Sequence, residues 1–369
     1  MAESGGKTYI FRGLPLTSDS RTTRYGFLLG SVTYCTWEKK DISSVTGVSH
    51  IIAPISKDGA LFYLRYLTYL FYLFLFGLLK IRKGDVCICM DLDTFIPIWF
   101  SSRFKKNFVA FDVVDPASQA RFKKIPLPRA IDALECFFLD RADLCIFPHE
   151  SRLSYYHDSD SHIFKRKSLV IENVPIVDSR STSSPRVGED VVIGYFGTLD
   201  SSRGLDALLN FAASNKHIVR LLIAGDGPES ATIMRAAKRH KNITYTGRYV
   251  PSDLENLYSQ VDFSWAYYDP ALKLHKYAAP NKFYEHLCFN CPIIVNDIIP
   301  QSFFVQKHET GIVASEVEVA DMRSGGNKFV ERVKNFQRKD IYSMWDKFYA
   351  GYYDAKKVEL TSKIKSTRK

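Results

Sequence analysis

The stretch VVIGYFGTLDSSRGLDALLNF, residues 191–211, decides the fold of this chain. Its apolar start, VVIGYF, predicts a buried strand, and the following Gly204 to Phe211 has the apolar spacing of a helix. The same alternation continues outward: we expect strands at 219–225, 243–247, 262–268 and 292–295, and helices at 228–239, 253–260 and 280–287. Repeated strand and helix units predict a parallel sheet covered by helices on both faces.

The first half of the chain repeats this pattern less regularly. Strands are predicted at 8–11, 85–90, 108–114, 144–147 and 168–174, and the Ser-rich segment 176–190 is typical of a linker. The fold class is therefore α/β, with two doubly wound Rossmann-like domains facing each other across a cleft. The predicted organisation is a first domain at 1–180, a linker at 181–190, a second domain at 191–340, and a C-terminal helix and basic tail at 341–369.

Glycine and polar residues follow the predicted strands of the second half. Gly197 lets the backbone turn close to a ligand, and Arg203 stands at the start of the next helix, whose N–H groups attract phosphate. Gly225 makes a tight turn, which also occurs without a ligand. Tyr249 and Val250 follow the third strand, where we expect their backbone groups to pair with a base edge. Because the carboxyl ends of parallel strands meet at one sheet edge, these residues predict one binding site.

The segment APNKFYEHLCFNCPIIV, residues 279–295, carries the strongest chemical signal. Pro280 is suited to opening a helix, which puts Lys282 in the first turn and Glu285 on the same face. A cation is disfavoured at a helix N-terminus unless an anion binds there, so Lys282 predicts a phosphate ligand. Glu285 can then accept hydrogen bonds from sugar hydroxyls, as in a nucleotide-sugar site. Taken alone, the segment is also compatible with an ordinary ion pair on a solvated helix.

The net charge of +10 is local. Lys and Arg outnumber Asp and Glu by 24 to 19 in residues 1–180 and by 6 to 1 in 355–369, but stand at 20 to 20 in 181–354. The basic part of the first half predicts contact with an anionic acceptor or membrane surface through Arg103, Lys105, Lys106, Lys123 and Lys124. No recognition helix, zinc-finger spacing or RNP-like string accompanies the charge, so we expect no nucleic-acid partner.

Residues 61–79, LFYLRYLTYLFYLFLFGLL, contain one charge and eight aromatic residues. A membrane span needs about 20 apolar residues, whereas 14 uncharged residues separate Arg65 from Lys80. We favour a helix lying in a membrane interface, with a buried core helix and a true span as alternatives. The amino terminus lacks the pattern of a secretory signal, so we expect the protein at the cytoplasmic side.

Four segments, GYFGTLDSSRGLDALL, LLIAGDGPE, ITYTGRYVPSDLENLYSQVDF and APNKFYEHLCFNCPIIV, resemble in this order the nucleotide-sugar-binding domain of GT-B glycosyltransferases, and family 4 in particular. The resemblance is strong over 191–300 and weaker before it. It implies sugar transfer from a UDP- or GDP-linked donor, without a metal or other cofactor. In bacterial members that build capsule, O-antigen or exopolysaccharide, the acceptor is a polyprenyl-diphosphate-linked saccharide. We therefore expect a peripheral enzyme at the inner face of the cytoplasmic membrane.

The resemblance also exposes departures. Arg203 stands at the position of the family's phosphate-binding Lys, but Thr198 replaces its Arg. Glu285 is the second of the family's two Glu, and Tyr277 replaces the first. The resemblance implies that both positions, with Asn281, belong to the donor site. These changes leave two alternatives, a catalytically inactive binding protein of the same fold and a nucleotide-sugar epimerase of the same architecture.

Two carboxylates are the candidate catalytic residues. The family often carries an Asp and a His near the reacting centre, and this chain has Asp112 and Asp115 in that segment. The family implies retention of configuration, whereas an inverting reaction would need one of these carboxylates as a base. Asp91 and Asp93 spell the DxD of metal-dependent glycosyltransferases of the other common fold. Since they lie far in sequence from the donor motifs, we expect them to line the cleft and to bind no metal.

Overall fold

The structure, a computed structural model, describes residues 6–16, 20–38, 47–55, 61–156, 163–177, 188 and 190–367. The chain forms two compact units, Met1–Glu172 with Gly351–Lys369, and Asn173–Ala350. The boundary thus falls at Glu172, before the predicted position 180. The predicted linker 181–190 lies outside the described residues except at 188 and 190. The predicted C-terminal region 341–369 is shared, because α13 (Tyr342–Tyr349) belongs to the second unit and α14 (Tyr352–Thr367) to the first.

The first unit contains a parallel sheet in the order β3-β2-β1-β4-β5-β6-β7. Its strands are β1 (Thr8–Arg12), β2 (Thr33–Thr36), β3 (Ser49–Ile52), β4 (Val86–Met90), β5 (Phe108–Asp112), β6 (Leu144–Phe147) and β7 (Ser168–Val170). Its helices before α14 are α1 (Ser20–Leu29), α2 (Phe62–Leu79), α3 (Leu92–Ser102), η2 (Arg103–Lys105), α4 (Pro128–Leu139), α5 (Ser151–Tyr155) and η3 (Ile163–Lys167).

Alternate residues of these strands point to opposite faces of the sheet. Ile10 and Ile88 face a core that includes Leu360 and Ile364, so α14 returns to cover the sheet on which the chain began. Phe11 follows Ile10 in β1, so its side chain points to the opposite face of the sheet. There it packs edge to face on Phe76 of α2. Both faces are therefore covered, and the strands read as nearly continuous apolar runs for that reason.

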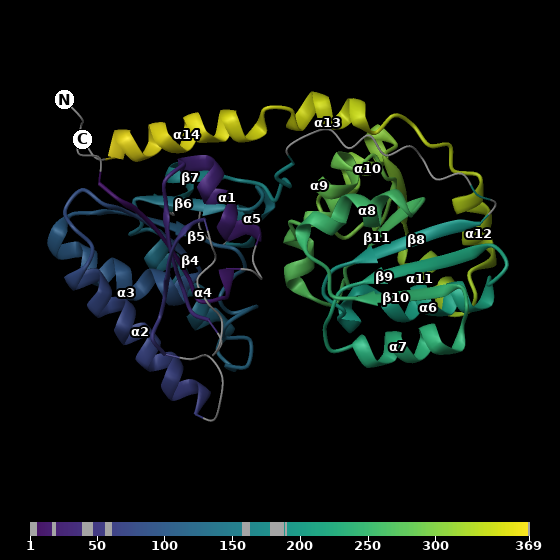
Figure 1. Cartoon of the computed structure of the whole chain (residues 1–369), viewed down its shortest axis with the longest axis horizontal. Coiled ribbons are helices and arrows are strands. Elements are labelled where there is room, and N and C mark those ends of the chain that lie inside the picture. The colour runs from purple at the N-terminus through teal and green to yellow at the C-terminus, as the bar shows by residue number, and fades with distance from the viewer. Residues whose placement is uncertain are drawn as a thin grey trace. The chain divides into compact units, whose positions relative to one another are not determined.

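The second unit repeats the design with a parallel sheet in the order β10-β9-β8-β11-β12-β13. Its strands are β8 (Val191–Phe196), β9 (Val219–Ala224), β10 (Ile243–Gly247), β11 (Phe263–Ala266), β12 (Ile293–Asn296) and β13 (Gly311–Ala314). Its helices before α13 are η4 (Ser201–Arg203), α6 (Leu205–Ser214), α7 (Ser230–Arg239), η5 (Pro251–Asp253), α8 (Leu254–Ser259), η6 (Lys273–Tyr277), α9 (Asn281–Cys288), α10 (Ser302–His308), α11 (Glu316–Arg323) and α12 (Asn327–Lys334) (Figure 1).

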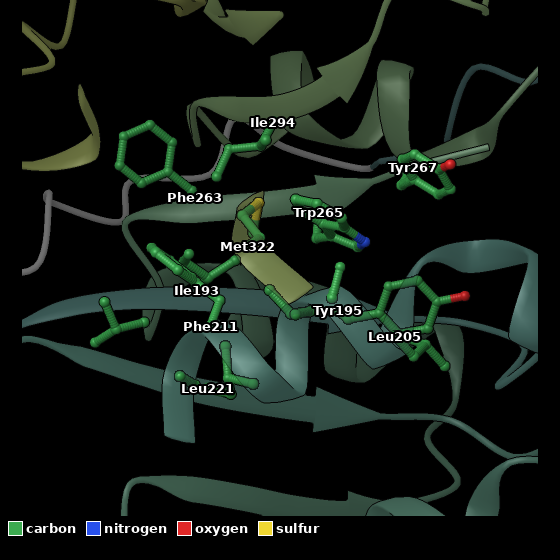
Figure 2. Packing of buried hydrophobic residues seen from close by; sticks show 14 of the residues in the cluster. Ile193, Tyr195, Leu205, Phe211, Leu221, Phe263, Trp265, Tyr267, Ile294 and Met322 are labelled. Atoms are coloured by element: carbon green, nitrogen blue, oxygen red, sulfur yellow. The ribbon is translucent and has the colours of Figure 1, made fainter. Parts of the chain in front are cut away.

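Two apolar layers sandwich this second sheet. On one face, Ile193, Phe211 and Met322 belong to a cluster formed with α6, α7, α11 and α12 (Figure 2). On the other, Val192 and Phe196 pack with residues of α8 and α9. In both units the first strand in the chain is central and the strand order reverses beside it, which is where ligands bind in open α/β sheets.

Helix α2 is unusually exposed for so apolar a sequence. Of its 18 residues, the buried ones are Tyr69, Leu73, Phe76 and Gly77. It packs along α3, where a Cβ on Gly77 would lie 1.8 Å from Ser101 Oγ, so the two helices approach more closely than a larger residue would permit. By length and composition alone α2 is also able to cross a membrane. Its small buried part contradicts the alternative of a buried core helix.

Candidate functional site

Two glycine turns shape the carboxyl edge of the second sheet. Gly197 follows β8 with φ of +148°, and Gly225 follows β9 with φ of +145°, in a region that favours glycine. A Cβ on Gly225 would lie 1.8 Å from the Gly197 carbonyl oxygen, so the two loops pack backbone against backbone. The N–H of Gly197 donates to the Ala224 carbonyl at 3.0 Å. This packing confirms that the chain turns at both glycines. It also leaves the Gly197 backbone beside a side chain of α9.

That side chain is Lys282. Pro280 is the residue before the first turn of α9, and Lys282 is the second residue of the helix. Its Nζ lies 4.5 Å from the centroid of the Tyr195 ring, and a Cβ on Gly197 would stand 2.8 Å from it. Burial lowers the pKa of Lys282 to about 8, an effect that Arg203 strengthens and Glu285 opposes. No carboxylate of the described chain forms an ion pair with this ammonium group.

Arg203 brings a second cation to the same place. Asp200 holds the turn η4 by accepting the Ser202 N–H at 3.0 Å, and the Arg203 carbonyl accepts the indole N–H of Trp265 at 2.9 Å. The guanidinium lies over Tyr268, 4.4 Å from the ring centroid. Its Nη1 is buried and has no hydrogen-bond acceptor among the described residues. Because a buried, unmatched donor is costly, this group calls for an anionic acceptor.

Glu285 lies one helical turn beyond Lys282. It is 8% exposed, and its Oε2 accepts the Tyr258 hydroxyl at 3.0 Å. Burial and the charge of Glu285 raise the pKa of Tyr249, which places that ring near the carboxylate. The structure therefore brings together Gly197, Arg203, Lys282 and Glu285, as the sequence predicts. Two cations and a carboxylate at one edge of the sheet suit a ligand with both phosphates and hydroxyl groups.

The remaining donor residues are more mixed. The prediction for Val250 is contradicted, because its N–H donates to Asp253 Oδ2 and its carbonyl accepts the Asp253 N–H, each at 2.9 Å. Both backbone groups are thus paired inside the turn that begins α8. Thr198 is exposed, and its carbonyl accepts the Tyr195 hydroxyl at 2.5 Å. Tyr277 is half-buried at the end of η6, and Asn281 is the exposed first residue of α9.

Sequence reasoning missed two residues of this site. Tyr195 is a core residue of β8, yet its ring also forms the surface beneath Lys282. His275 lies edge-on to Tyr268 at 5.1 Å between ring centroids, and its Nδ1 lies 2.8 Å from the Asp269 carbonyl. Burial and the nearby Arg203 lower the pKa of His275, which favours the neutral ring. Its position just after the fourth strand was the available signal.

In the first unit, Asp112 is a structural carboxylate. It ends β5 and is completely buried, with Oδ1 accepting Arg21 Nη2 at 2.7 Å and Oδ2 accepting the Tyr25 hydroxyl at 2.7 Å. A general base must reach the proton it removes. The prediction that Asp112 is catalytic is therefore wrong for this conformation. Asp115, by contrast, keeps 44% of its side chain exposed while pairing with Arg152 at 2.9 Å.

The predicted basic contacts also separate into two kinds. Lys105 is a capping residue, because its Nζ donates to the carbonyls of Gly77, Leu78 and Ile81 at the end of α2, at 3.1, 2.5 and 2.5 Å. Its prediction as an acceptor or membrane contact is contradicted. The side chains of Arg103, Lys106, Lys123 and Lys124 are exposed.

Asp91 and Asp93 pair with guanidinium groups. Asp91 pairs with Arg12, and Asp93 lies 3.3 Å from Arg121 Nε. Both carboxylates are buried. Burial raises the pKa of Asp93, and the Arg121 charge opposes that shift. Their charge is thus balanced inside the first unit, and the expectation that they line an open cleft is contradicted by their burial.

Residues 190–326 match the family model of the group 1 glycosyl transferases. The match lies within the second unit and contains all the predicted donor-site residues. No curated protein matches the chain in sequence.

Solved structures share the fold over nearly the whole chain. An α,α-trehalose-phosphate synthase (UDP-forming) from Burkholderia xenovorans, in complex with glucose-6-phosphate, is similar with a TM-score of 0.66 and 12% identity, over 98% of this chain and 100% of that chain. Anabaena HepE, in complex with UDP and glucose, is similar with a TM-score of 0.66 and 10% identity, over 97% and 99%. At such identities the likeness shows the fold alone. The predicted class of two Rossmann-like domains of the GT-B type is confirmed.

The Asp112 pair provides a test of its structural role. We expect Asp112→Asn to lower the free energy of unfolding by about 3–5 kcal/mol, because it leaves the buried Arg21 charge unbalanced. The matched control is Asp206→Asn, whose pair with Arg323 is exposed on both sides and is worth about 1 kcal/mol or less. Urea unfolding followed by circular dichroism measures both. Equal, small losses for the two variants would contradict the structural assignment of Asp112.

Proposed function

We propose that the protein is a glycosyltransferase that takes a sugar from a nucleotide-sugar donor bound in the second unit. The observation that carries the proposal is the pair of cations beside the Gly197 turn: a half-buried ammonium to which the described residues offer no ion-pair partner, and a guanidinium with an unmatched buried donor. A diphosphate would satisfy both groups. The group 1 glycosyl transferase match over the same residues supports this chemistry, and the UDP bound by HepE supports a UDP-linked donor.

In this proposal the cations stabilise the leaving group. Negative charge grows on the nucleotide diphosphate as the bond to the sugar breaks, and Lys282, Arg203 and the N-terminus of α9 face that charge. Such preorganised charge needs no bound metal to complete it. Glu285, anchored by Tyr258, would hold sugar hydroxyls of the donor.

The acceptor side rests on the first unit. We infer a reaction with retention, in which the donor phosphate receives the acceptor proton, and Asp115 as the carboxylate that remains accessible to orient the acceptor. The proposed acceptor is a saccharide linked to a polyprenyl diphosphate, in envelope polysaccharide synthesis. The enzyme would then work peripherally at the inner face of the cytoplasmic membrane.

The surface of α2 supports the membrane part of the proposal. Leu64, Leu67, Phe71, Leu75 and Leu79 recur every three or four residues and are 58, 62, 59, 37 and 76% exposed. Such a stripe on one helix suits insertion at the depth of lipid headgroups. We propose anionic phospholipid as its occupant, because exposed Lys80, Arg82 and Lys83 follow directly after the stripe.

An inactive binding protein is the second candidate, and the exchanged positions Thr198 and Tyr277 favour it. The two are separated by one assay in which UDP-glucose and GDP-mannose are offered with and without an acceptor extract. The enzyme predicts release of the nucleoside diphosphate. Tight binding of a donor with no release under any condition would favour the binding protein.

Donor binding tests the cation pair directly. We expect Arg203→Ala to weaken binding of the preferred nucleotide sugar about 10- to 100-fold, because a charge-assisted hydrogen bond contributes about 1.5–3 kcal/mol. Arg235→Ala is the matched control, since this arginine is exposed on α7 and contacts Thr232. Titration calorimetry measures both. If Arg203→Ala binds as well as the control, the proposed phosphate site is incorrect.

The pH dependence of binding tests Lys282. With a pKa of about 8 in the free protein, Lys282 is mostly protonated below pH 8 and loses its charge above it. An anion binds the protonated form, so affinity should be full at pH 6–7 and should fall as pH rises through about 8. In Lys282→Arg the charge persists, and its affinity, relative to its own value at pH 6, should stay level. Parallel pH profiles for the two proteins would argue against this role.

The α2 stripe is tested with vesicles of phosphatidylcholine and phosphatidylglycerol. We expect Leu67→Gln with Phe71→Gln to reduce binding at least about tenfold, because burying each apolar side chain is worth about 1.5–3 kcal/mol. The matched control is Phe303→Gln with Val317→Gln, which replaces two exposed apolar residues of the second unit. Sedimentation with vesicles gives the affinities. Unchanged binding by the α2 variant would remove α2 as the contact surface.

A further inference from the structure

A cavity lies in the first unit, away from the residues discussed as catalytic. It has a volume of about 950 Å³ and is lined by Lys7 and Asp85, which precede β1 and β4. It therefore opens at the amino edge of the first sheet. Asp112 and Asp115 lie at and after the carboxyl end of β5, the opposite edge of a parallel sheet. The volume is in the range of cavities that hold small ligands.

One wall of this cavity is apolar and belongs to α2. Tyr72, Leu75, Phe76 and Leu79 line it, and their spacing of three, one and three residues puts them on one face of the helix. Leu75 and Leu79 are also the last two members of the exposed stripe of α2. The apolar surface that we propose to meet the membrane thus runs without interruption into the cavity.

The other wall is basic. Lys7, Lys80, Arg82 and Lys83 line the cavity, and all four side chains are exposed. The described part of the chain offers no ion-pair partner to any of them. The one carboxylate of the lining, Asp85, accepts the backbone N–H groups of Lys7 at 2.8 Å and of Arg82 at 2.7 Å.

Asp85 thus holds the two basic segments together through their backbones and leaves their side-chain charges uncompensated. A ligand that occupies this cavity must present an anion to the basic wall and apolar atoms to α2. Lys80 also lies at the C-terminal end of α2, where a cation is favoured without any ligand. That local explanation does not extend to Lys7, Arg82 and Lys83, which lie outside the helix.

We propose that this cavity is a binding site for one anionic phospholipid, separate from the donor and acceptor sites. The lipid phosphate would lie among the four cations, and the glycerol and first acyl carbons along Tyr72 and Leu79. The inference rests on the proposed membrane association, and it adds a site that selects lipid charge and fixes the orientation of the first unit on the surface.

The test compares two double variants that each remove two exposed basic charges from the first unit. Arg82→Gln with Lys83→Gln alters the cavity, and Arg129→Gln with Arg166→Gln alters exposed residues outside it. Vesicles of phosphatidylcholine with and without phosphatidylglycerol are sedimented with each protein. We expect the cavity variant to lose at least about tenfold in affinity for the phosphatidylglycerol vesicles, since each basic residue at a membrane surface contributes about 1 kcal/mol. The control should change about threefold or less.

Equal losses for the two variants would overturn the proposal, because they would indicate a diffuse electrostatic attraction. A second arm adds short-chain phosphatidylglycerol or inorganic phosphate as competitor. Displacement from the vesicles by the lipid and not by phosphate supports a lipid site, whereas equal displacement by phosphate would make it a phosphate site and overturn the lipid assignment.

Donor titration of the cavity variant with UDP-glucose separates the two proposals. Its donor affinity should equal that of the unmodified protein, because the donor residues belong to the other unit. A protein that selects anionic vesicles but binds no nucleotide sugar would refute the proposed function alone. A protein that binds the donor but discriminates no lipid would refute the lipid site alone.

Discussion

The candidate donor site of the second unit depends on one ammonium group that is partly shielded from water. Lys282 is held against the Tyr195 ring and the backbone of Gly197, where water cannot solvate it fully, and its lowered pKa records that cost. The glycine turns after β8 and β9 pack backbone to backbone, and a Cβ on Gly197 would lie 2.8 Å from the ammonium, so glycine at this position leaves room for it. The same place also receives the Arg203 guanidinium, so the fold concentrates positive charge at the edge where its central strands end.

The first unit uses charge in the opposite way. Asp112, Asp91 and Asp93 lie at or just after the carboxyl ends of its strands, which are positions associated with function. Each is buried against a guanidinium, from Arg21, Arg12 and Arg121 respectively. These pairs fix the loops of the unit and leave Asp115 as the accessible carboxylate of the predicted pair. The units therefore differ at these strand ends. The three carboxylates of the first unit lie beside guanidinium groups, whereas the described residues of the second unit offer Lys282 no ion-pair partner.

Helix α2 has the most unusual composition in the sequence, and its apolar residues form part of the surface of the first unit. Its buried residues hold it to α3 and the sheet, with Tyr69 stacked on Trp37 at 4.8 Å between ring centroids, and Lys105 closes its C-terminal carbonyls. These contacts fix the helix while leaving an apolar stripe in contact with solvent. An exposed stripe of this length carries a free-energy cost in water, which is why a membrane partner is the physical counterpart that we propose for it.

The sequence by itself determined the alternation of strands and helices, and therefore two parallel sheets, because burial on both faces imposes apolar runs and glycine turns that are visible in the letters. It also determined Lys282, Glu285 and Arg203 as neighbours, since all three follow strands whose ends must meet at one edge. Only the tertiary structure decided which charges are compensated. Asp112 and Asp115 differ by three positions and look alike in sequence, yet one meets Arg21 from α1 in the core and the other stays exposed. The difference between Asp112 and Asp115 depends on partners that are distant in the chain. The return of α14 to the first unit depends on such partners too, so neither can be read from the neighbouring residues in the sequence.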